Sequence, residues 1–273
     1  MDFMSVIAKF YARAAAVNSF VCVGLDTDLA QIPARFQSST TPQLDFNRWV
    51  IDQTAPYAAA FKINTAFYEA RGSAGWVELE QTIAYLRANH PSILTICDAK
   101  RGDIGSTSAA YARAIFDHMG FDSVTLNPYL GRDALEPFLS RGDKGCILLC
   151  RTSNPGSGEF QDMPVGGMPL WLWIGEQISR TWNGRHNCML VVGATYPKEI
   201  ERVRAVVGDM PFLIPGVGAQ GGDLEATVRA GLTPERQGII INASRSIIYA
   251  NDPAAAAKTL RDEIQAVVNK VMK

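Results

Sequence analysis

The chain has 273 residues, 47% of them hydrophobic, and its 26 lysines and arginines nearly balance its 27 aspartates and glutamates. Such a chain can bury a large core, and its near-neutral charge gives no electrostatic case for binding nucleic acid or an anionic membrane. No apolar run approaches the roughly 18 residues of a transmembrane helix, and the N-terminus lacks the apolar core of a signal peptide. We therefore expect a cytoplasmic protein that contacts neither membrane nor nucleic acid.

Short apolar runs alternate with helix-length amphipathic segments along the chain. Strands are predicted at 20–25, 58–63, 93–97, 123–126, 145–150, 189–192, 212–214 and 238–241. Helices are predicted over segments that include 76–88, 107–119, 170–182, 197–207 and 224–230. The segment before the first strand is expected to be an amphipathic helix. A final Ala-rich helix follows Asp252-Pro253, because proline in the first turn favours a helix start.

This alternation predicts an α/β fold with a parallel sheet covered by helices. Eight strand and helix units in about 250 residues fit a (β/α)8, or TIM, barrel, and a doubly wound open sheet is the alternative. With no Pro/Ser-rich linker, a single domain is predicted over 1–273, with a helical extension at 1–19, a barrel core at 20–249 and a C-terminal helix at 250–273. The Gly-, Pro- and Ser-rich stretch 151–168 is expected to be a long functional loop.

The five cysteines are interpreted as reduced, buried residues. Their number is odd and four of them lie in strand-like runs. Cys146 and Cys150 would stand about 13 Å apart along one strand, whereas a disulfide needs Cα atoms within about 7 Å. No Cys/His spacing typical of a metal site appears, so no metal is expected.

Charged and polar residues stand at the C-terminal ends of the first three predicted strands, where barrel enzymes build their active sites. Asp26 ends the first strand, Lys62 and Asn64 the second, and Asp98 and Lys100 the third. Side chains two apart share a strand face, and the outer face packs against apolar helices, where an unpaired charge is costly. We therefore expect these groups to point into one pocket. A purely structural ion-pair network is the alternative.

Two later segments have the features of a phosphate site. The Gly-rich loop Pro215-Gly216-Val217-Gly218-Ala219-Gln220 follows the seventh strand, and glycines let backbone amides approach an anion. Arg245 follows the eighth strand and could hold phosphate through its planar fork, or form a surface ion pair. Barrels often bind phosphate with these two loops. The loop also matches a dinucleotide fingerprint, but too little chain follows it to complete a dinucleotide-binding half.

These segments together resemble the orotidine 5′-phosphate decarboxylase family, in its longer bacterial form (type 2). The resemblance rests on Asp98-x-Lys100-x-x-Asp103-Ile104, with Phe61-Lys62-Ile63-Asn64 upstream and Pro215-Gly216-Val217-Gly218-Ala219-Gln220 downstream, in that order. It implies a barrel homodimer that converts orotidine 5′-monophosphate to uridine 5′-monophosphate and carbon dioxide. This is the last step of de novo pyrimidine nucleotide synthesis, and the resemblance implies no metal and no organic cofactor.

The resemblance also implies a role for each matching residue. Lys100 would give a proton to carbon 6 of the pyrimidine, Asp98 would lie beside the departing carboxylate, and Lys62 would complete the charged network and contact the ribose. The other implied substrate-binding residues are Asp26 at the ribose, Ser153 at the base, Gln220 and Arg245 at the phosphate, and Asn64, Pro215 and Ser244. The residues implied to reach the partner subunit's site are Asp103, Ile104 and Thr107.

The chemistry fits these residue types. Loss of carbon dioxide leaves negative charge on a ring carbon, and a fixed ammonium there would stabilise that charge and then supply the proton. None of the three histidines ends a strand, which disfavours histidine acid/base catalysis.

Two other functions remain as alternatives. A related sugar-phosphate lyase shares the Asp-x-Lys-x-x-Asp motif but uses acidic residues to hold magnesium, which Lys62 and Asn64 disfavour. A non-catalytic nucleotide-phosphate-binding barrel would keep the Gly-rich loop and Arg245 but would not need both lysines and all three aspartates.

Overall fold

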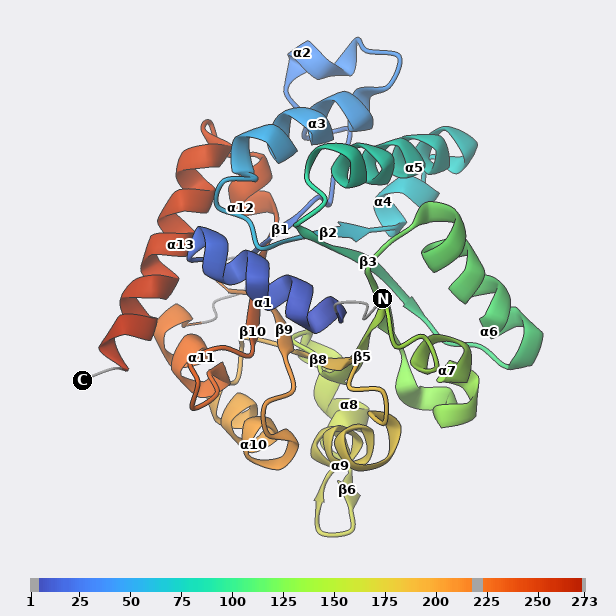
Figure 1. Cartoon of the computed structure of the whole chain (residues 1–273), viewed down its shortest axis with the longest axis vertical. Helices are drawn as coiled ribbons and strands as arrows, with labels where there is room; N and C mark the ends of the chain where they lie inside the picture. Colours follow the sequence, from blue (N-terminus) through green and yellow to red (C-terminus); the bar gives the residue numbers. More distant parts are fainter. Residues whose placement is uncertain (1–4, 218–222, 272–273) are drawn as a thin grey trace.

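The computed structural model describes residues 5–217 and 223–271 as a barrel surrounded by helices (Figure 1). Eight strands, all paired in parallel, close the barrel in the order β1-β2-β3-β4-β5-β8-β9-β10. They span Val21–Gly24 (β1), Ala60–Asn64 (β2), Leu94–Arg101 (β3), Ser123–Leu126 (β4), Gly145–Arg151 (β5), Cys188–Val192 (β8), Phe212–Pro215 (β9) and Ile239–Ala243 (β10). The predicted TIM-barrel fold is confirmed.

The longer helices of the outer layer surround the barrel (Figure 1). Each lies between two consecutive barrel strands along the chain, except the last, which follows the final strand. They are α3 (Pro42–Thr54), α5 (Gly72–Asn89), α6 (Gly105–Ala112), α7 (Arg132–Leu139), α9 (Leu170–Gln177), α10 (Pro197–Val207), α11 (Leu224–Gly231) and α13 (Pro253–Lys270). Two of them continue into π-helical turns, α6 through Arg113–Met119 and α9 through Ile178–Trp182. The short helices are α2 (Ala34–Gln37), α4 (Ala66–Glu69), α8 (Gly158–Gln161) and α12 (Arg245–Ile248).

The stretch predicted as a long loop after the fifth strand has secondary structure of its own. Besides α8, it contains a small antiparallel hairpin, in which β6 (Pro164–Val165) pairs with β7 (Met168–Pro169). The turn between them is Gly166-Gly167, with φ angles of 58° and 86°. Such left-handed angles suit glycine, and a two-residue Gly-Gly turn is a standard hairpin connection. The hairpin signal was therefore present in the sequence.

The N-terminal helix α1 (Val6–Val17) lies across the amino-terminal end of the barrel, near the centre of the view in Figure 1. Val6, Phe10 and Ala14 project from one side of it and are at most 5% exposed. They pack in one cluster with side chains at the beginnings of the strands, including Ala60 and Met189. Because interiors are packed without large voids, α1 fills the end of the barrel and leaves the carboxyl end of the strands open.

We expect Phe10→Ala to lower the free energy of unfolding by about 3 kcal/mol or more, because it removes a fully buried ring and leaves a cavity. Urea unfolding followed by circular dichroism measures this loss. A matched control is Phe160→Ala, since the Phe160 ring is 68% exposed and its removal should change stability by about 0.5 kcal/mol or less. Equal losses in the two variants would contradict the role assigned to α1.

Candidate active site

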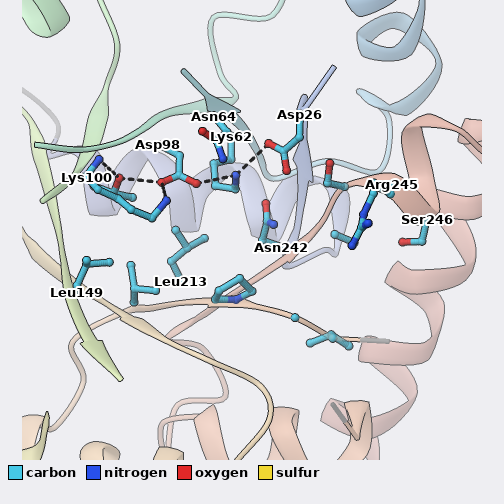
Figure 2. Close-up of a pocket in the computed structure, with 17 residues that line it drawn as sticks. Asp26, Lys62, Asn64, Asp98, Lys100, Leu149, Leu213, Asn242, Arg245 and Ser246 are labelled. Carbon is cyan, nitrogen blue, oxygen red and sulfur yellow. Dashed lines mark hydrogen bonds and ion pairs between the residues drawn. The ribbon is translucent and has the colours of Figure 1, made fainter. Parts of the chain in front are cut away.

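A pocket opens at the carboxyl end of the barrel, and all eight barrel strands or the residues directly after them contribute to its wall (Figure 2). Most of the residues predicted for a site meet here, although they come from five different strand ends. Those that line the pocket are Asp26, Lys62, Asn64, Asp98, Lys100, Pro215, Ser244 and Arg245. The expectation that the charged groups of the first three strands share one pocket is confirmed.

Four charged side chains alternate in sign across one wall of this pocket (Figure 2). The Lys62 ammonium donates to Oδ1 of Asp26 at 3.3 Å and to Oδ2 of Asp98 at 3.0 Å. The Lys100 ammonium donates to Oδ1 of Asp98 at 2.7 Å. The side chains of Lys62 and Asp98 are only 6% and 11% exposed, whereas that of Lys100 is 51% exposed. Lys100 is therefore the more accessible of the two cations of this network.

The network keeps its two innermost groups charged. Burial alone would raise the pKa of Asp98, but Lys62 and Lys100 outweigh burial and hold that pKa well below its usual value. Burial alone would lower the pKa of Lys62, but Asp26 and Asp98 outweigh it and leave the pKa of Lys62 raised. Each charge thus depends on its neighbours of opposite sign.

The backbone of Lys100 is unusual. Its φ is +48°, a left-handed conformation that a residue other than glycine seldom adopts. The pairing of β3 with β4 shifts register between Cys97 and Arg101, on either side of this position. The Lys100 N–H donates to the Thr125 hydroxyl at 2.9 Å, and that hydroxyl donates to Asp98 at 2.9 Å. Lys100 and Asp98 therefore meet through this irregularity and not through the regular strand alternation that the sequence analysis used.

Sequence reasoning missed several residues of the pocket wall. Leu149, Val191 and Leu213 give the pocket an apolar side, and Leu149 and Leu213 lie across from the charged network in Figure 2. Asn242 lies between them and Arg245, is 7% exposed, and its Oδ1 has no hydrogen-bond partner among the described residues. Of these residues, only Asn242 had a local signal, because it is a polar residue in an otherwise apolar strand.

The remaining predicted residues do not line the pocket. Asp103 and Ile104 follow the end of β3, and Thr107 lies in the first turn of α6; Ile104 is 65% exposed. Ser153 lies on the segment after β5, close to Gly193. Gln220, predicted to bind phosphate, lies outside the described residues.

Three further findings concern the class of protein. Among the helices of the described ranges, none combines the length and apolar character needed to cross a membrane. Within the same ranges, no group of three or more His, Cys, Asp or Glu side chains is arranged to hold a metal ion. All five cysteines are buried and free.

Comparison with known proteins agrees with this geometry. The model of the orotidine 5′-phosphate decarboxylase / HUMPS family matches residues 19–260. The chain belongs to this family. It is 48% identical over 259 residues to the orotidine 5′-phosphate decarboxylase of Herpetosiphon aurantiacus, covering 94% of both chains. It is 44% identical to that of Azoarcus sp., over 98% of this chain and 99% of the relative.

Solved structures of family members have the same fold. Leishmania donovani OMP decarboxylase superposes with a TM-score of 0.86 at 39% identity, over 97% of this chain and 99% of that one. Leishmania donovani UMP synthase superposes with a TM-score of 0.89 at 41% identity over 97% of this chain, which spans 57% of that longer protein.

The charged network predicts a pH dependence of stability. Because the pKa of Asp98 in the folded state lies below its unfolded value of about 3.9, its charge stabilises the fold above that value. This contribution is lost as the pH falls through the folded pKa. We therefore expect the wild type to lose free energy of unfolding relative to Asp98→Asn as the pH falls from about 5 to 3. Urea unfolding at a series of pH values measures this, and a constant difference would contradict it.

Proposed function

We propose that this protein decarboxylates orotidine 5′-monophosphate to uridine 5′-monophosphate and carbon dioxide. The observation that carries the proposal is the alternating row Asp26, Lys62, Asp98 and Lys100, which ends in a reachable ammonium at the pocket. The names of relatives at 44–48% identity support the same activity. The enzyme would complete the synthesis of the pyrimidine nucleotide.

In the proposed reaction, the bond between carbon 6 and the carboxylate breaks, and its electron pair stays on carbon 6. The Lys100 ammonium stabilises this charge as it develops, because a fixed positive group in a partly desolvated site needs no reorganisation. Lys100 then transfers a proton to carbon 6 and regains one from solvent. Asp98, beside the departing carboxylate, holds Lys100 in place through the hydrogen bond between them. No metal or organic cofactor takes part in this scheme.

The substrate would lie across the pocket from the loops after β9 and β10 to the end of β3. Arg245, Ser244, Pro215 and Gln220 would bind the phosphate, in the loops where barrels commonly hold one. The groups proposed to bind the ribose are Asp26, Lys62 and Asn64. The base would then face Ser153 and the apolar side of the pocket. Binding energy from the phosphate, a part of the substrate remote from the reaction, can be used to lower the barrier at the reacting carbon.

We further propose a homodimer in which each subunit completes its partner's site with Asp103, Ile104 and Thr107. These residues follow the carboxyl end of β3 but do not line the pocket of their own chain. Exposed apolar side chains stand on this loop and on the neighbouring loop after β4, with Ile104 at 65%, Tyr129 at 87% and Leu130 at 48% exposure. Exposed apolar groups next to a polar pocket are typical of an interface.

The proposed compartment is the cytoplasm. Cys146 and Cys188 are register partners on the neighbouring strands β5 and β8, yet both are free. Free thiols this close are typical of a reducing compartment.

The two alternative functions have less support. A magnesium-dependent sugar-phosphate lyase would place acidic groups at the end of β2, where this chain has Lys62 and Asn64. A non-catalytic nucleotide-binding barrel would not need a buried carboxylate held between two ammoniums, since burying each charge is costly.

Replacing Lys100 by alanine tests the proposed chemistry. The wild type should release carbon dioxide from orotidine 5′-monophosphate with a metal chelator present. The Lys100→Ala substitution should lower the turnover rate by about a thousandfold or more, because it removes both the electrostatic stabilisation and the proton donor. Lys258→Ala, an exposed lysine on α13 paired with Asp262, is the matched control and should remain fully active. Undiminished turnover in Lys100→Ala, or activity that disappears with the chelator, would contradict the mechanism.

Mixed dimers test the shared site. Lys100→Ala and Asp103→Ala subunits should each be poorly active alone. Their heterodimer has one intact site, because the Asp103→Ala subunit keeps its own Lys100 and receives Asp103 from its partner. Random pairing should therefore recover about a quarter of the wild-type activity. The turnover assay on the co-expressed mixture measures this, and the heterodimer purified through two different affinity tags should keep about half of the wild-type activity. Activity no greater than the sum of the separate variants would contradict sharing.

A further inference from the structure

Arg151 is a buried cation that the proposed reaction does not use. It is the last residue of β5 and is 3% exposed. Its guanidinium donates to Glu199 on α10, at 2.5 Å from Nε and 3.4 Å from Nη2. It also pairs with Asp162 at 3.3 Å through Nη1 and lies over the Tyr196 ring, 5.0 Å from the ring centroid. One side chain thus joins β5, the segment after it, and the start of α10.

Further hydrogen bonds join the two ends of the segment 152–163, which follows β5. The Gln161 side chain accepts from the Thr152 backbone N–H at 3.0 Å and donates to the Thr152 hydroxyl at 2.8 Å. Nη1 of Arg151 reaches the same Gln161 oxygen at 3.5 Å. The two ends of the segment are therefore tied to each other, and Arg151 ties both of them to α10 through Glu199.

Ser153 is carried by this closed segment and lies tightly against the turn after β8. A Cβ atom added at Gly193 would stand 2.8 Å from the Ser153 Cβ and 2.9 Å from its backbone nitrogen. Real Cβ atoms do not approach this closely, so the contact depends on glycine at that position. The Gly193 N–H also donates to the Arg151 carbonyl at 2.9 Å. Arg151 and Gly193 therefore set the position of Ser153 from two sides.

We propose that Arg151 is a positioning residue that holds Ser153 at the base end of the nucleotide site. A buried ion pair adds little net stability over well-packed apolar groups, but its directional hydrogen bonds fix geometry. Arg151 contacts two carboxylates and one amide, which come from α10 and from the segment after β5. These directional contacts fix the position of that segment more closely than apolar packing would. This inference rests on the proposed function, because Ser153 is assigned to the base only under that function.

The test compares two ligands that differ only in having a base. Titration calorimetry would measure the affinities of uridine 5′-monophosphate and ribose 5-phosphate for the wild type and for Arg151→Met. Loss of one correctly placed hydrogen bond should weaken uridine 5′-monophosphate binding by about tenfold. Ribose 5-phosphate should be unaffected. Ser153→Ala should show the same base-selective loss, and adding Arg151→Met to it should cause no further change in the ratio of the two affinities.

Arg204→Met is the matched control. Arg204 is another part-buried arginine, but it donates to the backbone carbonyls of Gly208, Met210, Gly231 and Gly238, at the closed end of the barrel. Its replacement should lower stability and leave the ratio of the two affinities unchanged. If Arg151→Met does not fold, Glu199→Gln gives a milder disturbance of the same contacts and should shift the ratio in the same direction.

One result would overturn the inference and leave the proposed function intact. In that result, the wild type binds both ligands and turns over orotidine 5′-monophosphate, but Arg151→Met or Glu199→Gln weakens the binding of both ligands equally. A further fall of the affinity ratio in the double variant would also overturn it, since Arg151 would then act independently of Ser153. A wild type that releases no carbon dioxide would overturn the proposed function itself.

Discussion

The site depends on one carboxylate that two ammoniums and a hydroxyl share. Asp98 accepts from Lys62, Lys100 and Thr125, which come from three different strands. An isolated charge at this depth would cost several kcal/mol, and it is tolerated only when its partners have good geometry. That geometry exists only if β2, β3 and β4 are fixed relative to one another, including the register shift between β3 and β4. The closed barrel is therefore a condition for the charged site, and α1 closes the end that the site does not use.

The sequence predicted the barrel well because strands buried on both faces appear as continuous apolar runs separated by helices. The β4 strand and helix α10 have the predicted ends. The carboxyl ends of the strands were predicted less well, since β3 extends to Arg101 and β5 to Arg151, each across a register shift. Such shifts are set by neighbouring strands, and no local pattern around Lys100 indicates its left-handed backbone.

The sequence predicted the site residues that place a charge at the end of an apolar run. It did not predict the apolar residues of the pocket wall. Asp26, Lys62, Asp98 and Lys100 stand out in strands that should contain none of these residue types. Leu149, Val191 and Leu213 have the residue types of any buried strand, so nothing local distinguishes a pocket wall from the core. Arg151 was hidden for a different reason. Its partners lie 10 to 48 positions away along the chain, and only the fold brings them together.

Under the proposed function, the strands and the loops have different tasks. The groups assigned to the reacting carbon lie on or next to barrel strands, where packing on both faces limits their movement and preorganises the charges. The groups assigned to the phosphate and the base lie in the loops after β5, β9 and β10, which must admit a ligand. A loop that is open to a ligand can hold a side chain in a defined position only if contacts outside the pocket fix the conformation of the loop. The buried contacts of Arg151 meet that requirement for Ser153, because they join the loop to a helix without occupying the space of the ligand.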